Sequence, residues 1–170
     1  MTIQHHFLFC LLALGPLTLL FNRPAAADEP DSDAYLTPAG QLTAALEVRS
    51  LQGGFAGFTG RQWNIEPSGR WTAATVFNQE VKQTGQGMLS NEELAVLAGE
   101  LAMYDLLGLP AKEGQPVVNP RIVEIRFGVH RATLSVQILP EPDKATIAGR
   151  FSGIVAAVKD AVEAEEPKAE

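Results

Sequence analysis

The sequence is poor in the residue types that carry most enzyme and metal chemistry. It has one cysteine and three histidines among 170 residues. Cys10 lies inside an apolar run near the N-terminus, and only His130 follows that run. Disulfides, thiolate catalysis and the usual Cys and His zinc sites are therefore excluded from the rest of the chain. We expect His130 to be an exposed residue of a hairpin turn, because no serine and carboxylate motif accompanies it.

Long hydrophobic runs are also scarce. The stretch FLFCLLALGPLTLLF, from Phe7 to Phe21, has 15 residues, whereas a membrane span needs about 20. An Ala-x-Ala site at Ala25 to Ala27 follows it, which is typical of a secretory signal peptide cleaved before Asp28. We therefore predict a signal peptide over residues 1–27, a secreted or periplasmic location, and no membrane contact after cleavage. A retained anchor is the alternative.

Positive charge is in deficit. The chain has 13 Lys and Arg against 20 Asp and Glu, a net charge of −7. Cleavage would remove Arg23 and no acid, leaving 12 against 20, or −8. Nucleic-acid binding requires the opposite sign, so no nucleic-acid partner is expected. A protein partner is expected, with a weak preference for a basic one.

The remaining chain divides into a spacer, one domain and a tail. Residues 28–40 (DEPDSDAYLTPAG) are acidic, rich in turn formers and without periodicity, which predicts a flexible spacer. Residues 165–170 (EEPKAE) predict a disordered tail. Residues 41–164 are long enough for a single α+β domain with one core.

Hydrophobic periodicity in this domain predicts five strands and two helices in the order βββαββα. For the first helix, Ser90 is the expected N-cap, Glu93 completes a capping box, and Gly108 followed by Pro110 should end it. Every strand alternates apolar and polar residues, so one face of the sheet is solvated and both helices must cover the other. The prediction is a two-layer α+β sandwich with an antiparallel sheet of about five strands. The expected strands and final helix cover residues 42–49, 62–66, 71–77, 123–127, 132–138 and 147–162.

Other prominent side chains have structural interpretations. Glu92 and Glu93 suit a helix N-terminus better than acid catalysis, and both tryptophans lie on the apolar phase of their strands, which favours core packing. The arginines flanking the first hairpins are expected to pair across strands with glutamates rather than form a basic patch. These arginines are Arg49, Arg61 and Arg70, their expected partners are Glu47 and Glu66, and the tryptophans are Trp63 and Trp71.

The segment between the first two strands is unusual. RSLQGGFAGFTGRQW, from Arg49 to Trp63, places two phenylalanines among four glycines. It lacks the Lys-Ser/Thr of a P-loop and the spacing of a dinucleotide fingerprint, and a strand follows it instead of a helix, so it is not a phosphate site. Either the phenylalanines are apolar anchors held out for a partner, or the glycines permit a tight connection while at least one ring folds back onto the sheet.

Part of this segment has a family likeness. GGFAG (Gly53 to Gly57), after the alternating LEVRS and before Arg61, resembles the emfourin family of proteinaceous inhibitors of thermolysin-like M4 metalloproteases. The similarity spans Leu46 to Arg61, and elsewhere it lies in the order of elements. The resemblance implies a small α+β domain and a target enzyme that accepts large apolar side chains beside the scissile bond. The predicted partner-binding residues are Gly53, Gly54, Phe55, Ala56, Gly57, Phe58 and Arg61.

The sequence therefore predicts a protein without enzymatic activity. No catalytic, cofactor-binding or metal-binding residue is assigned, and no cofactor is expected. The leading hypothesis is a secreted or periplasmic binding module that inhibits a thermolysin-like metalloprotease through the Gly53 to Gly60 loop. The alternative is a non-inhibitory envelope or extracellular domain that binds another protein through its sheet face. The sequence does not indicate the oligomeric state.

Overall fold

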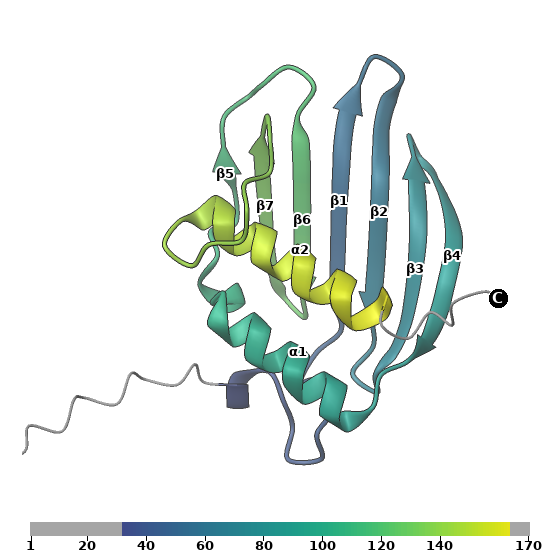
Figure 1. The fold of residues 1–170 in the computed structure, drawn as a ribbon, viewed down its shortest axis with the longest axis vertical. Coiled ribbons are helices and arrows are strands. Elements are labelled where there is room, and N and C mark those ends of the chain that lie inside the picture. Colours follow the sequence, from purple (N-terminus) through teal and green to yellow (C-terminus); the bar gives the residue numbers. More distant parts are fainter. Residues whose placement is uncertain (1–31, 164–170) are drawn as a thin grey trace, which may run out of the picture.

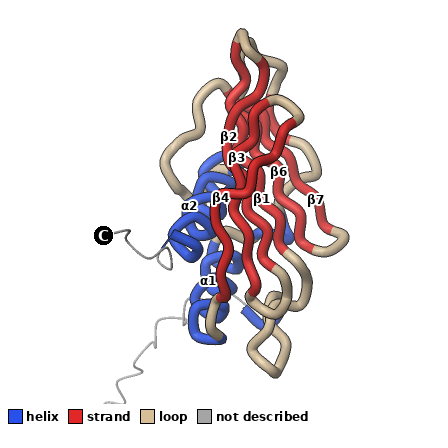
Figure 2. Tube along the Cα trace, turned by 90° about the vertical axis from the view of Figure 1, so that its right-hand side faces the viewer, coloured by secondary structure: helices blue, strands red, loops and turns tan. Residues whose placement is uncertain are grey.

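A computed structural model describes residues 32–163 as two layers, a sheet and a pair of helices (Figure 1). The sheet has seven strands in the order β4-β3-β2-β1-β6-β7-β5. Both helices lie on one face of the sheet, and the other face is open (Figure 2). The two-layer α+β architecture predicted from the sequence is thus confirmed. Within residues 32–163, no helix combines the length and the apolar character that a membrane crossing requires.

The strands and helices follow one another along the chain with short connections. The strands are β1 Leu46–Gly54, β2 Gly57–Ile65, β3 Arg70–Phe77, β4 Glu80–Met88, β5 Glu113–Gly114, β6 Arg121–Phe127 and β7 His130–Val136. The helices are α1 Asn91–Met103 and α2 Ile147–Glu163, with short 3-10 turns η1 Ser32–Ala34 and η2 Leu106–Gly108.

The prediction of about five antiparallel strands was wrong in number and in direction. β4 was missed because its sequence, EVKQTGQGM, has no buried residue and no apolar alternation. It is held to β3 by main-chain pairing from Arg70↔Met88 to Phe77↔Glu80. β5 has only two residues and pairs in parallel with β7, which makes the sheet mixed.

Helix α1 begins as predicted and ends earlier than predicted. The Ser90 hydroxyl accepts a bond from the Glu93 amide (3.3 Å), and the Glu93 carboxylate accepts one from the Ser90 amide (2.7 Å), so the capping box is confirmed. The helix stops at Met103, and Asp105, at φ +47°, takes the left-handed conformation expected for Gly108.

A side chain from α2 stabilises the chain at this early end. The Arg150 guanidinium donates to the main-chain oxygens of Tyr104 (2.9 Å) and Asp105 (2.6 Å) and to the Asp105 carboxylate (2.7 Å). Carbonyls at a helix C-terminus lack partners within the helix, and this guanidinium supplies them.

The ordered domain starts before Gln41, because part of the expected spacer belongs to it. Tyr35 is buried, its ring centroid lies 5.6 Å from that of Phe127, and its hydroxyl accepts a bond from the Leu107 amide at 3.3 Å. Leu36 forms an isolated bridge with Leu42. The predicted signal peptide (residues 1–27), the first spacer residues and the tail (165–170) lie outside the described residues.

The core fills the space between the sheet and the helices. Trp63 and Trp71 are both buried in it, so the prediction that they serve core packing is confirmed. Full burial of a large apolar side chain contributes about 1.5–3 kcal/mol to stability.

The ion pairs on the open face partly match the predicted pairing. Arg70 lies 4.0 Å from Glu66, as expected. Arg49 instead pairs with Glu124 of β6 at 2.9 Å, and Glu47 pairs with Arg126 at 3.4 Å. The prediction that Glu47 would pair with one of the hairpin arginines was wrong, because β6 lies beside β1 in the sheet and supplies the closer partners.

Candidate partner-binding site at one end of the sheet

The glycine-rich segment is a hairpin with a two-residue turn. β1 and β2 pair from Leu46↔Ile65 to Gly54↔Gly57, which leaves Phe55 and Ala56 at the turn. Gly57 has φ +102°, a conformation that residues with a side chain rarely adopt. A Cβ there would also lie 2.7 Å from Cγ of Asn78. A residue with a side chain at position 57 would therefore be strained.

The turn projects beyond the neighbouring strands (Figure 1). Pairing of β1 with β6 ends at Gln52↔Arg121, and pairing of β2 with β3 ends at Thr59↔Phe77. Gly54 and Gly57 are each two residues further along. At about 3.3 Å per residue, the turn extends roughly 7 Å past the last paired residues of its neighbours.

Hydrogen bonds hold the base of this projection on both sides. On the β6 side, the Gly53 amide donates to the Pro120 oxygen (2.7 Å), and the Gln52 side chain donates to the Asn119 oxygen (2.9 Å). On the β3 side, the Asn78 amide donates to the Phe58 oxygen (2.6 Å). The hairpin is thus anchored within three residues of its tip, which limits the entropy it can lose on binding.

The two phenylalanines take different positions. Phe55, at the turn, is fully exposed at 110% of its reference area, whereas Phe58 is 37% exposed. Phe58 stands opposite Gly53, and its Cε1 would be only 3.2 Å from a Cβ on that glycine. Phe55 therefore fits the anchor interpretation, and Phe58 is partly folded back over a glycine.

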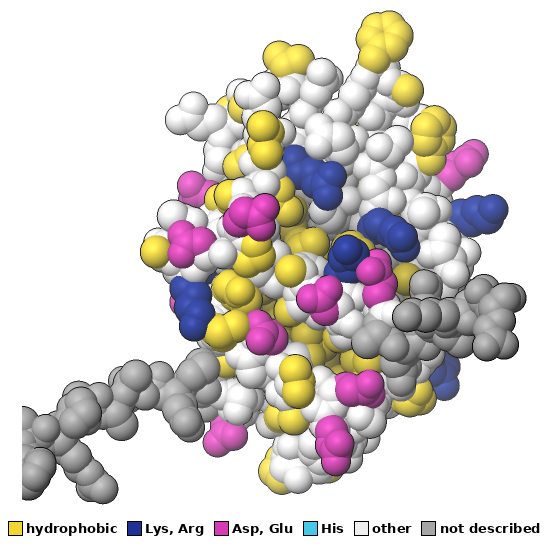
Figure 3. Space-filling view, in the orientation of Figure 1, with side chains coloured by type: hydrophobic (Ala, Val, Ile, Leu, Met, Phe, Trp, Pro, Cys, Tyr) yellow, Lys and Arg dark blue, Asp and Glu magenta, His cyan; other side chains and the backbone are white. Residues whose placement is uncertain are grey.

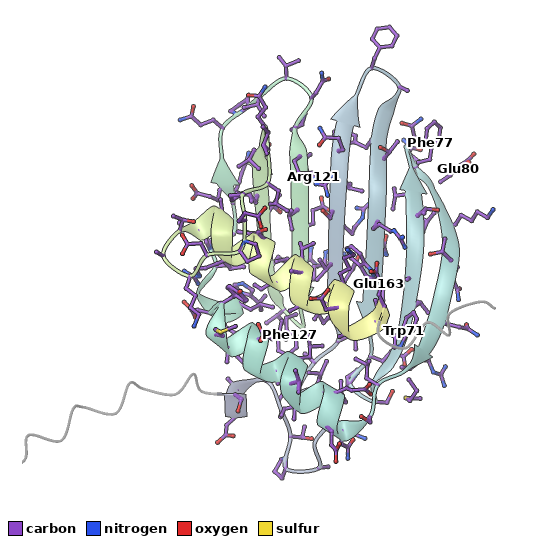
Figure 4. The ribbon with its side chains drawn as sticks, in the orientation of Figure 1. Trp71, Phe77, Glu80, Arg121, Phe127 and Glu163 are labelled. Atoms are coloured by element: carbon purple, nitrogen blue, oxygen red, sulfur yellow. The ribbon has the colours of Figure 1, made fainter. Side chains whose placement is uncertain are left out.

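Two further apolar side chains from other parts of the chain lie at the same end of the sheet. Phe77, at the end of β3, is 54% exposed, and Val118, in the loop between β5 and β6, is 83% exposed. Figure 4 shows Phe77 and Glu80 at the tip of the β3 and β4 hairpin. A hollow of about 570 Å³ here is bordered by Phe58, Phe77 and residues 78–80. We call this set the tip patch: Phe55, Phe58, Phe77 and Val118.

Arg61 does not belong to the tip patch. It lies four residues beyond Gly57 on β2, roughly 13 Å along the strand. It stands opposite Ser50, whose hydroxyl accepts a bond from Arg121 at 3.0 Å. Figure 4 labels Arg121, the first residue of β6. Of the predicted partner-binding residues, the structure groups Gly53 to Phe58 and leaves Arg61 apart.

The tip patch consists of exposed apolar side chains from three parts of the chain. His130 begins β7 at the opposite end of the sheet and is half-buried, not exposed as expected. Among residues 32–163, no three His, Cys, Asp or Glu side chains gather as metal ligands would.

Among the described residues, Tyr35 and Glu93 have shifted pKa values, and both shifts have causes away from the tip. Burial raises the pKa of Tyr35, and the hydrogen bonds from Ser90 lower the pKa of Glu93. Neither group is placed to act on a ligand bound at the tip patch.

Comparison of the chain with protein-family models gave no match, and a comparison with curated proteins gave none either.

Proposed function

We propose that the protein is a non-catalytic binding module that inserts the β1 and β2 hairpin tip into a cleft of a partner protein. Phe55 carries this proposal. Its ring is fully exposed on a two-residue turn, so folding gains nothing from its apolar area. Aromatic residues on preorganised elements are typical of the few contacts that dominate protein interfaces.

The surroundings of Phe55 support an inserted tip rather than a flat contact. The turn projects past both neighbouring strands, while Phe77 at the end of β3 and Val118 in the β5–β6 loop flank it at the same end of the sheet. Phe55 can therefore enter a pocket first, and the flanking side chains can contact its rim. Burying the Phe55 ring would contribute about 1.5–3 kcal/mol before ordering costs.

The partner that we propose is a thermolysin-like metalloprotease. The resemblance of Gly53 to Gly57 to the emfourin family supports this choice, because it implies a target that accepts large apolar side chains beside the scissile bond. The predicted secretion signal suits a protein that acts outside the cytoplasm.

Enzyme inhibition provides the test. The chain without residues 1–27 retains every residue of the described core, from Tyr35 to Val162. It should inhibit a thermolysin-like protease, and a higher concentration of a small peptide substrate should relieve the inhibition, because both occupy the active-site cleft. Absence of inhibition at micromolar protein would contradict the metalloprotease proposal. Inhibition unaffected by substrate would contradict insertion in the cleft.

A further inference from the structure

A second surface, on the helix layer, has features that the hairpin does not explain. An open groove of about 720 Å³ runs between α1 and α2. Figure 3 shows apolar side chains between the two helices with acidic side chains around them. The apolar part of its lining consists of Val96, Leu97, Tyr104, Pro142, Gly153, Ala156, Ala157 and Ala161. We call this surface the helix groove.

The groove exists because α2 presents small residues to it. Gly153, Ala157 and Ala161 follow at intervals of four on one side of the helix, so no large side chain fills the space. Gly153 cannot become larger, since a Cβ would be 2.5 Å from Cδ1 of Tyr104. Across the groove, Val96 of α1 is 70% exposed. The outer face of a surface helix is ordinarily polar, and here it is partly apolar.

The rim of the groove is acidic. Glu92, Glu93, Glu100 and Asp160 line it, and no Lys or Arg is among the lining residues. On α1, Glu92, Val96 and Glu100 are spaced by four and share one side of the helix. A ligand in the groove would therefore meet apolar surface at its centre and carboxylates along its edges.

We propose that the helix groove binds a basic amphipathic helix of a partner protein. Apolar residues at helical spacing would occupy the floor, and flanking Lys or Arg side chains would pair with the rim carboxylates. α1 has 13 residues, or about 20 Å at 1.5 Å per residue, which matches a partner helix of three to four turns.

The charge of the rim argues against a second copy as the occupant. In a two-fold dimer the same surface is used by both chains, so the acidic rim of one groove would face the acidic rim of the other. Like charges brought together in an interface are unfavourable. A cationic helix removes this repulsion and gains attraction.

The test uses a synthetic amphipathic peptide of about 14 Leu and Lys residues, long enough for four helical turns. Its binding to the chain lacking residues 1–27 is measured by fluorescence anisotropy, beside a peptide with Glu in place of Lys. We expect the Lys peptide alone to bind, and its affinity to fall as salt is raised. Equal binding of both peptides would overturn the proposal.

Matched charge reversals locate the site. Glu100→Lys with Asp160→Lys changes the net charge as much as Glu66→Lys with Glu80→Lys, a pair outside the groove lining. The groove pair should weaken binding of the Lys peptide about tenfold or more, because two attractions become repulsions. The control pair should weaken that binding by no more than about twofold. Similar losses for both pairs would mean nonspecific attraction and would overturn the proposal.

Two more measurements distinguish the remaining outcomes. Phe55→Ala should leave peptide affinity unchanged, which separates this site from the hairpin. Sedimentation of the unliganded chain should give a monomer that the groove reversals do not alter. Self-association abolished by those reversals would make a second copy the occupant and contradict the proposal.

Discussion

The close approach of β1 and β2 at Gly60 allows a sharp test of the hairpin that carries Phe55. A Cβ on Gly60 would lie 2.9 Å from Cα of Leu51 and 3.0 Å from the carbonyl carbon of Ser50. Both atoms belong to the main chain of β1, which cannot move away easily because β6 pairs with it from Leu46 to Gln52. Gly60→Ala must therefore separate the two strands or rotate the backbone.

The expected magnitude follows from the kind of atom displaced. Overpacking a filled interior costs about 1–3 kcal/mol, and main-chain atoms place Gly60→Ala near the upper end of that range. Gly54→Ala, in the same hairpin, is the control, because the nearest atom to its Cβ would be the Gly57 oxygen at 3.8 Å. It should change the free energy of unfolding by less than about 0.5 kcal/mol.

Urea unfolding followed by tryptophan fluorescence measures both variants, since Trp63 and Trp71 are buried and report loss of the core. Gly60→Ala should lower the free energy of unfolding by about 3 kcal/mol. A loss equal to that of Gly54→Ala would refute the close approach of the two strands.

Two further predictions concern Arg150 on α2 and Tyr35 in the segment before β1. Arg150→Ala should lower the free energy of unfolding by about 2 kcal/mol, because it removes charged hydrogen bonds to the α1 terminus. Arg126→Ala removes an exposed ion pair with Glu47 and should cost at most about 1 kcal/mol. Equal losses in urea unfolding would contradict this prediction. Because burial raises the pKa of Tyr35, its contribution to stability is complete below the unfolded value near 10 and is lost as pH rises through the folded value. Urea unfolding at pH about 8 and about 11 should show a fall in stability that Tyr35→Phe reduces, and an undiminished fall in the variant would assign it to other groups.

The two ends of α1 show what local sequence can predict. The N-terminus depends on Ser90 and Glu93, three residues apart, and both of their bonds were expected from sequence. The C-terminus depends on Arg150, which is 45 residues from Asp105. No local sequence pattern indicates that contact. The sequence therefore predicts Gly108 in the left-handed conformation that Asp105 takes.

The sheet shows a similar division. Strands that bury one face carry the alternation from which they were predicted. β4 buries nothing and β5 has only two residues, so both are defined by main-chain pairing to a neighbour. Such pairing leaves little trace in the identity of the side chains.

The sequence indicates the part of the candidate site that one hairpin supplies. It does not indicate the side chains that other parts of the chain bring to the same end of the sheet. Phe55 stood out because glycines surround it. Phe77 and Val118 come from two other parts of the chain, and only the strand order places them at the same end of the sheet. Arg61 was included because it follows GGFAG in the stretch that resembles the emfourin family, yet the extended strand carries it away from the tip.

The central claim is that the partner is bound through Phe55 at the hairpin tip. The most direct measurement compares the inhibition constants of Phe55→Ala and Val129→Ala against a thermolysin-like protease. Val129 is also fully exposed, but it follows β6 at the opposite end of the sheet. Loss of an interface anchor costs about 2 kcal/mol or more, so Phe55→Ala should weaken inhibition about thirtyfold while Val129→Ala leaves it unchanged. Equal inhibition by both variants, with folding intact, would contradict the account.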